Sequence, residues 1–213
     1  MLEVITIPVT EFGQNARVLV CNQTKSAVIV DPGGEAEKIA KVCAERNVSV
    51  NAVWLTHSHL DHCAGVAPLL KIFPVPLYAH PAEQMFREKV PEIAMMYGLP
   101  RGEWPACPEP SHNIKGGEEL QLGNIVAKVI YTPGHSPGHV SFYFKSESLI
   151  VSGDVLFQGS IGRTDLPGGD HEQLIATIRR ELLILPDDTR VLSGHGDDTS
   201  IGAEKQRNPF LNT

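Results

Sequence analysis

The chain has 213 residues, 42% of them hydrophobic and 20% charged, with a formal net charge of −7. This length is enough to bury a sizeable core, and we expect residues 1–213 to form a single domain. The negative charge argues against broad, sequence-independent nucleic-acid binding, which needs a basic surface. Nine histidines against four cysteines make histidine the residue type to follow.

The N-terminal ten residues have no basic segment followed by a long apolar run, so no signal peptide is predicted. No stretch of about 18 apolar residues is present, and a membrane span is therefore not expected. The four cysteines form no CxxC pair, which is typical of reduced thiols in a cytosolic protein. We therefore expect a cytoplasmic protein with neither membrane nor nucleic-acid partners.

Apolar runs bounded by turn residues predict strands, and apolar residues at helical spacing predict helices. The stretch 98–117 is rich in Pro and Gly and is expected to be a surface excursion. Strand-rich segments interleave with helices twice over, which predicts an α/β or α+β sandwich with helices outside. Strands are expected at 4–9, 17–21, 27–31, 52–55, 76–79, 125–131, 140–144, 149–152 and 190–193. Helices are expected at 35–46, 63–73, 82–97 and 171–185, the last with Asp170 as its N-cap, and a short tail follows residue 193.

One loop after the buried strand 52–55 concentrates metal-ligand side chains: His57, His59, Asp61 and His62. Imidazole and carboxylate groups suit zinc and related divalent ions. In an extended loop His57 and His59 point to the same side, whereas Asp61 and His62 face another direction. A polar loop with chance histidines would explain any one of these residues, but it explains four together poorly.

Three more candidate ligands follow apolar strands in the second half of the chain. His135 comes after the strand 125–131, Asp154 after 149–152 and His195 after 190–193. A glycine beside each permits a sharp turn, and strand ends are where a rigid sheet presents chemistry. Asp154 alone could equally be a strand-end cap, but the repeated pattern favours a ligand.

Seven ligands indicate two divalent ions. The first ion would be held by His57, His59 and His135, and the second by Asp61, His62 and His195. A carboxylate has two oxygens, so Asp154 would bridge the two ions.

This order of ligands resembles that of the metallo-β-lactamase superfamily. The resemblance implies an α+β fold, a four-layer αββα sandwich with a dinuclear site at one edge of its two sheets. Within the superfamily the chain is similar to the compact bacterial glyoxalase II-type hydroxyacylglutathione hydrolases. The stretches that carry this similarity are DPGG at 31–34, TPGHSPGH at 132–139, SGDVLF at 152–157, GRTDLPGGD at 162–170 and NPF at 208–210.

The resemblance implies hydrolysis of the thioester S-D-lactoylglutathione to D-lactate and glutathione, a step of methylglyoxal detoxification. A hydroxide bridging the two ions would attack the thioester, and Asp61 would orient it as well as bind metal. The thiol of the leaving group has a pKa of about 8.5, so it can leave as a thiolate with little protonation. The ions implied are zinc, with iron and manganese as alternatives.

Substrate contacts are less defined by the sequence. Longer glyoxalase II enzymes carry an extra C-terminal helical region with basic residues for glutathione, and this chain ends without it. Arg163 is a candidate contact for a substrate carboxylate, with a surface ion pair to Asp165 as the alternative. Tyr143 is a candidate pocket residue, with a place in the strand core as the alternative. Cys63 is expected to be a buried thiol, and no role is assigned to His80, His112, His139 and His171.

Three alternatives stay open. A persulfide dioxygenase shares the implied fold and the motif at 162–165, and it would use one iron held by the equivalents of His57, His135 and Asp154. Another metallo-hydrolase of the superfamily is a second alternative. A metal-stabilised binding module is the third, although structural zinc sites are usually closed four-ligand sites.

Overall fold

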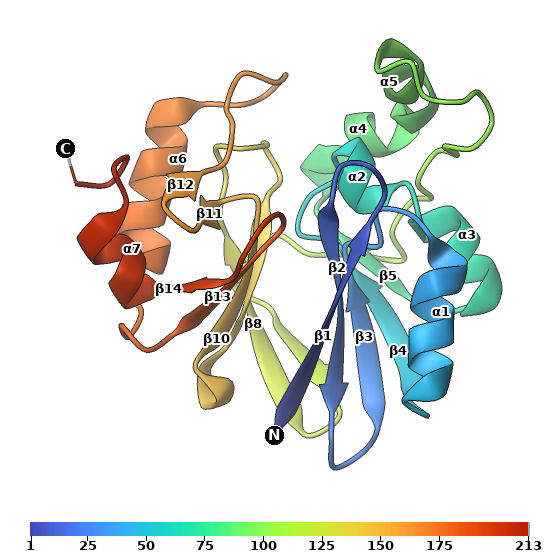
Figure 1. Cartoon of the computed structure of the whole chain (residues 1–213), viewed down its shortest axis with the longest axis horizontal. Coiled ribbons are helices and arrows are strands. Elements are labelled where there is room, and N and C mark those ends of the chain that lie inside the picture. Colours follow the sequence, from blue (N-terminus) through green and yellow to red (C-terminus); the bar gives the residue numbers. More distant parts are fainter. Residues whose placement is uncertain (213) are drawn as a thin grey trace. The chain divides into compact units, whose positions relative to one another are not determined.

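The computed structural model describes residues 1–212, which form two compact units. Unit 1 comprises Met1–Ile114 and Leu122–Ile125, and unit 2 comprises Lys115–Gln121 and the chain from Val126 onward. Each unit combines one sheet with several helices (Figure 1).

Unit 1 is built on a six-stranded sheet whose strands lie in chain order. The first three strands pair antiparallel, and the third to the sixth pair parallel. Parallel strands end at the same edge of a sheet, so the segments that follow the third and fourth strands emerge side by side. The strands are β1 (Leu2–Val9), β2 (Gln14–Cys21), β3 (Ser26–Val30), β4 (Ser49–Trp54), β5 (Leu77–Ala79) and β6 (His112–Asn113).

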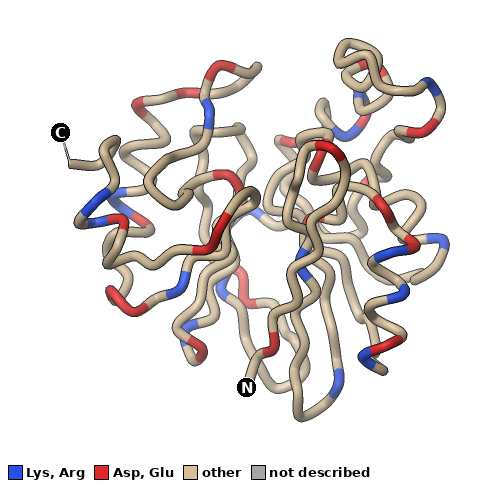
Figure 2. The backbone as a smooth tube through the Cα atoms, viewed as in Figure 1, with Lys and Arg blue, Asp and Glu red and all other residues tan. Residues whose placement is uncertain are grey.

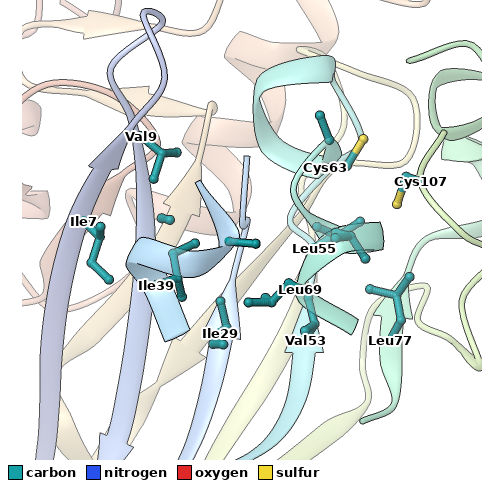
Figure 3. Packing of buried hydrophobic residues seen from close by; sticks show 14 of the residues in the cluster. Ile7, Val9, Ile29, Ile39, Val53, Leu55, Cys63, Leu69, Leu77 and Cys107 are labelled. Atoms are coloured by element: carbon teal, nitrogen blue, oxygen red, sulfur yellow. The ribbon is translucent and has the colours of Figure 1, made fainter. Parts of the chain in front are cut away.

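Two helices of unit 1, α1 (Ala36–Glu45) and α3 (Val66–Ile72), pack against this sheet (Figure 1). Ile39 of α1 and Leu69 of α3 are fully buried in one apolar cluster with Ile29 and Val53 from the strands (Figure 3). This burial removes the apolar stripe of each helix from water, and it supplies most of the driving force for their docking.

The expected helices at 63–73 and 82–97 are both divided. The first begins earlier than expected, as α2 (Leu60–Cys63), and continues as α3 after a break at Gly65. The second consists of a 3-10 turn at Pro81–Glu83, α4 (Gln84–Glu88) and α5 (Val90–Met96). Pro91 has no N–H and fits only the first turn of a helix, so a new helix begins beside it.

The sheet of unit 2 has the order β14-β13-β10-β9-β8-β7. The central strand β9 pairs antiparallel with both β8 and β10, and β10 pairs parallel with β13. Strands β8, β10 and β13 therefore run in one direction and end at the same edge. The strands are β7 (Glu119–Leu122), β8 (Ile125–Tyr131), β9 (Val140–Phe144), β10 (Leu149–Gly153), β13 (Arg190–Ser193) and β14 (Thr199–Ser200), with a separate pair β11 (Leu156–Phe157) and β12 (Ser160–Ile161).

Helix α6 (His171–Thr177) continues into a π turn (Ile178–Leu182) and packs its Leu174 against Ile150 and Val191 of the sheet. The expected N-cap is confirmed, because the Asp170 side chain accepts a hydrogen bond from the Gln173 N–H at 2.9 Å. A short 3-10 turn at Lys145–Glu147 joins β9 to β10.

The segment after residue 193 is more than the tail that was expected. It contains β14 and helix α7 (Ile201–Arg207). Ser200 caps this helix by accepting a hydrogen bond from the Ala203 N–H at 3.2 Å. The helix carries few apolar residues, and Ile201 alone anchors it in the core cluster of unit 2, so helical periodicity was weak here.

The α+β class is confirmed in both units, since each combines helices with a six-stranded sheet. Lys and Arg are interspersed with Asp and Glu along the chain, without a long run of either sign (Figure 2). Among residues 1–212, no helix has the length and apolar character required to cross a bilayer.

Candidate metal centre

The seven candidate ligands all lie just beyond strand ends, as the sequence predicted. Unit 1 carries four of them after β4, and unit 2 carries three, after β8, β10 and β13. Five are buried, although they are polar, and the other two, Asp61 and His195, are partly exposed, with side-chain exposures of 19% and 29%. Buried imidazoles and carboxylates require partners or a metal ion, so their burial needs a specific arrangement.

In unit 1, the loop from His57 to His62 brings its imidazoles together. The ring of His57 lies 4.1 Å from that of His62 and 4.7 Å from that of His59, measured between centroids. The edge of His59 also contacts Phe86 of α4, with ring centroids 5.1 Å apart. Asp61 and His62 belong to α2, which starts within the loop.

A buried carboxylate behind this loop, Asp31 at the end of β3, fixes two of the imidazoles. Its Oδ1 accepts from the Thr56 N–H at 2.7 Å, and its Oδ2 accepts from the Thr56 hydroxyl at 2.6 Å. Oδ2 also accepts from His62 Nδ1 at 3.0 Å. Because the Thr56 hydroxyl donates to Asp31, it accepts from His57 Nδ1, 3.0 Å away. Both histidines thus carry a proton on Nδ1, and each leaves an unprotonated Nε2 that could bind a metal ion.

For Asp31 to bond with Thr56 and His62, the turn at residues 31–34 must lie directly against the loop at residues 57–62. A Cβ at Gly33 would be 1.5 Å from the carbonyl oxygen of Asp61, so only glycine fits. Asp31 itself adopts a left-handed conformation with φ 49°. Asp31, His57 and His62 offer ligand atoms within 4.8 Å of one another, but Asp31 is already engaged and acts as the support of the other two.

In unit 2, Asp154 lies between two histidines. Its Oδ2 is 3.7 Å from His135 Nε2 and 3.6 Å from His195 Nε2. These separations are long for hydrogen bonds, whereas two donors at about 2.1 Å from one tetrahedral ion are about 3.4 Å apart. In unit 1, Asp61 Oδ2 and His62 Nε2 are similarly 3.8 Å apart. The donor types and their spacing within each unit therefore fit divalent metal ions.

His135 is oriented by a segment that follows β12. Its Nδ1 donates to the carbonyl oxygen of Arg163 at 2.7 Å, which leaves Nε2 unprotonated on the side of Asp154. The neighbouring Gly162 makes this approach possible, since a Cβ there would lie 1.9 Å from the Asp154 carbonyl oxygen and 3.2 Å from His135 Nδ1. Each unit thus places a glycine against the backbone of an aspartate ligand.

A bulge in β10, just before Asp154, changes the direction of the strand at this residue. Val151 pairs with Leu192 of β13 and Gly153 pairs with Ser193, so Ser152 is an extra residue in β10. Such bulges bend a strand and redirect the residues that follow it.

The other residues singled out from the sequence lie as follows. The Arg163 side chain, 56% exposed, forms a two-pronged ion pair with Asp165 at 2.7 and 2.8 Å. Tyr143 belongs to the core cluster of unit 2. Cys63 is a buried thiol, as expected, and donates to the Ser58 carbonyl oxygen at 3.4 Å; burial raises the pKa of this thiol well above its usual value. All four cysteines are free thiols.

Sequence reasoning missed the residues that support the ligands: Asp31, Thr56, Thr132 and His139. Two signals were present in the chain. Asp31 follows a strand and precedes Pro-Gly-Gly, which is the same pattern of strand end and glycine that marked the ligands. His139 repeats the Pro-Gly-His of His135 four residues later.

Residues 9–195 match the family model described as the metallo-beta-lactamase superfamily. The chain is 42% identical to the Haemophilus influenzae protein named hydroxyacylglutathione hydrolase GloC, over 97% of each chain. It is 40% identical to a Bacillus subtilis protein named probable metallo-hydrolase YqgX, over 97% of this chain and 96% of that one.

Two solved structures are similar over nearly the whole chain. One is described as the BLEG-1 B3 metallo-beta-lactamase, with a TM-score of 0.91, 40% identity and full coverage of both chains. The other is TTHA1623 in a di-iron-bound form, with a TM-score of 0.89, 38% identity and coverage of 98% and 100%. The ligand pattern, the two α+β units and these likenesses agree, and the chain belongs to the metallo-β-lactamase superfamily and has its fold.

Proposed function

We propose that this metallo-hydrolase is a thioesterase that converts S-D-lactoylglutathione and water to D-lactate and glutathione. The observation that carries the proposal is the set of seven ligand residues in the order of a dinuclear hydrolase, each at a strand end. The relative named hydroxyacylglutathione hydrolase, which matches along the whole length, supports the choice of a glutathione thioester.

Each unit would supply part of the ligand set. We assign one ion to His57, His59 and His135, the other to Asp61, His62 and His195, and a bridging role to Asp154. Zinc, iron and manganese all accept these donors, and a relative binds two irons. When bound, the ions would lower the pKa of a coordinated water toward about 7 and stabilise negative charge on the thioester oxygen.

The chain's own residues prepare this chemistry. Asp31, Thr56 and the Arg163 carbonyl hold the Nδ1 protons of three histidines, so that each presents Nε2 without rearrangement. Asp61, which is partly exposed, would accept a hydrogen bond from the attacking water and orient it. A thiolate leaves readily at neutral pH because the pKa of its thiol is about 8.5. No dedicated general acid is therefore required.

Substrate recognition is assigned to the exposed Arg163. Its guanidinium is held by the Asp165 carboxylate, which keeps the pKa of that carboxyl at about 2, with the hydrogen bond from Arg163 as the main cause. A glutathione carboxylate has the same shape and charge as the Asp165 side chain, so it could replace it on the guanidinium. Tyr143, nine-tenths buried in the core of unit 2, would line the site only through its small exposed part.

The test combines elemental analysis of the purified protein with a S-D-lactoylglutathione assay. We expect two metal ions per chain, and we expect His59→Ala and Asp154→Ala each to abolish hydrolysis and reduce bound metal. His171→Gln, at an exposed position of α6, is the control and should retain both. Full activity in either ligand variant would refute the assignment. A single iron, with oxygen consumed on glutathione persulfide, would favour the persulfide dioxygenase instead.

A second activity deserves the same assay because the structural neighbour described as a B3 metallo-beta-lactamase is 40% identical over its full length. A chromogenic cephalosporin would be compared with the thioester at equal enzyme concentration. We expect kcat/KM to be higher for the thioester, and the reverse order would replace the thioesterase by a β-lactamase as the main activity.

A further inference from the structure

His139, a fully buried histidine outside the seven-ligand set, receives a hydrogen bond from the backbone of a ligand. Its Nε2 accepts from the Asp154 N–H at 3.1 Å, and its Nδ1 lies 2.9 Å from the Thr132 hydroxyl. We propose that His139 is a positioning residue that fixes Asp154 for metal binding. This rests on Asp154 being a metal ligand in the proposed function.

Two groups of fixed role, a backbone N–H and a backbone carbonyl, determine the direction of the bonds that link Asp154, His139, Thr132, Ser141 and Ser152. A backbone N–H only donates, so His139 Nε2 accepts and the ring proton is on Nδ1, which donates to Thr132 Oγ1. The Thr132 hydroxyl then donates to Ser141 Oγ at 3.0 Å. Ser141 in turn donates to the Ser152 carbonyl oxygen at 3.4 Å, and a carbonyl only accepts. The chain of bonds therefore has one polarity throughout.

This chain of bonds begins and ends on the same strand end. It leaves the backbone at Asp154, passes through residues at the end of β8 and in β9, and returns to the backbone at Ser152 in β10. Thr132 is also held directly, because its N–H donates to the His139 carbonyl oxygen at 2.9 Å. The bulged end of β10 is thus tied to the strand that leads to His135.

The consequence for Asp154 follows from its place in the bulge. The strand pairing of β10 with β13 ends at Gly153, and backbone bonds hold the residues on either side of Asp154, while the Asp154 N–H itself donates to His139 Nε2. We infer that this bond sets the orientation of the Asp154 backbone. That backbone sets the carboxylate whose Oδ2 lies 3.6 and 3.7 Å from the two imidazole nitrogens. Outer partners of metal ligands typically change metal affinity about 10–100-fold when they are removed.

A role in core packing alone makes a different prediction from a positioning role. Packing would be satisfied by any apolar residue of similar volume, whereas positioning requires an acceptor at the place of Nε2. Glutamine puts its amide oxygen close to that place, and asparagine, one methylene shorter, puts a donor near Nδ1 and no acceptor near Nε2. The pair His139→Gln and His139→Asn therefore isolates the bond to Asp154, with His139→Leu as the apolar variant.

The experiment measures metal affinity by competition with a chelating dye, using zinc alone, and kcat on the thioester where it is active. We expect His139→Asn and His139→Leu to bind zinc about 10–100-fold more weakly, and His139→Gln to stay within about threefold of the parent. His171→Gln serves as the control on an exposed histidine. Parent-like zinc affinity in folded His139→Leu would overturn the proposal, and so would equal losses in the Gln and Asn variants.

A second measurement does not depend on any variant folding. Long-range ¹H–¹⁵N spectra of the metal-free protein, with labelled histidine, should show His139 with its proton on Nδ1. A proton on Nε2 would overturn the proposal. Neither the zinc competition nor the tautomer uses a thioester, so a failure of the proposed substrate would appear separately, as intact zinc binding without hydrolysis.

Discussion

The two units support their candidate metal ligands with different chemistry. In unit 1 the central group is a carboxylate, Asp31, which accepts three hydrogen bonds and reaches His57 through Thr56. In unit 2 the central group is an uncharged imidazole, His139, which reaches Asp154 through its backbone. Both networks include a threonine hydroxyl, but Thr56 lies between Asp31 and His57, whereas Thr132 lies on the side of His139 away from Asp154.

The difference follows from what each unit must hold. Histidine ligands need a proton held on Nδ1, and a buried carboxylate is a strong acceptor for such protons. An aspartate ligand needs its own carboxylate left for metal, so its support has to act on the backbone instead. The charged group should therefore contribute more to stability, and the neutral group should act mainly on metal affinity.

The largest effect is expected at Asp31. In Asp31→Ala three buried donors lose their acceptor, and we expect the free energy of unfolding of the metal-free protein to fall by about 3–4 kcal/mol. Asp31→Asn keeps one acceptor for the Thr56 N–H and tolerates the left-handed backbone, so its loss should be about half as large. Urea unfolding measures both. A loss below about 1 kcal/mol for Asp31→Ala would remove the basis of the comparison.

Gly33 and Gly162 each lie against the backbone carbonyl of an aspartate, and replacing them tests whether the two units are equally intolerant of a Cβ. Gly33→Ala and Gly162→Ala would each drive a methyl group into a backbone carbonyl, and we expect each to lose about 3 kcal/mol of stability together with bound metal. Gly13→Asn is the control, at φ 61° with no atom within 4 Å of a Cβ. Thermal unfolding and metal content are the measurements. A difference of more than about 2 kcal/mol between the two alanine variants would show that one unit relaxes more easily.

The threonines give the sharpest matched pair, because both are fully buried and both become valine at nearly constant volume. Thr56→Val removes a hydrogen bond to a carboxylate, and we expect it to lower stability by about 2 kcal/mol. Thr132→Val interrupts a neutral chain of bonds, and about 1 kcal/mol is expected. Denaturant unfolding of the two variants under the same conditions measures the two losses in the free energy of unfolding. An equal loss would mean that charge does not distinguish the units.

The smallest effect is expected at the exposed ion pair of unit 2. Arg163→Gln should return the pKa of Asp165 from about 2 toward 3.8, its ordinary value, because the hydrogen bond from the guanidinium is lost. A carboxyl with a lowered folded pKa stabilises the protein above its unfolded pKa, and this contribution disappears as the pH falls through about 2. For so exposed a pair the thermal midpoint at pH 7 should not change. NMR titration of the Asp165 carboxyl measures the shift, and an unshifted titration would contradict it.

The places of the candidate ligands beyond strand ends could be predicted from the sequence because strand ends are marked locally, by an apolar run, a glycine and a His or Asp residue. The capping of α6 by Asp170 was predictable for the same reason. The supports were not predictable, because their partners are distant in the chain: Asp31 and Thr56 are 25 residues apart, and His139 and Asp154 are 15 apart. Only the register of the sheets brings such pairs together.

Helix boundaries show the same limit. Pro91 could be recognised as a possible helix start, but periodicity continued through it and the segment 82–97 reads as one helix. The helix at Ile201 has one deeply buried apolar side chain, and a single anchor gives no period to detect. The Glu204 carboxylate accepts hydrogen bonds from the Gly159 N–H and the Asn208 side-chain amide, and these bonds stabilise the helix in place of a broad apolar face.

The direction in which the candidate ligand Asp154 points depends on the number of residues in β10, because that strand contains one extra residue. Side chains alternate between the two faces of a strand, so adding or removing one residue turns everything beyond it to the opposite face. Ser152 is that residue, and it precedes Asp154 by two positions. Two relatives with identical ligand residues, but with β10 differing by one residue, would therefore present different groups to the same metal ion. Comparison of such proteins has to count residues along this strand as well as identify them.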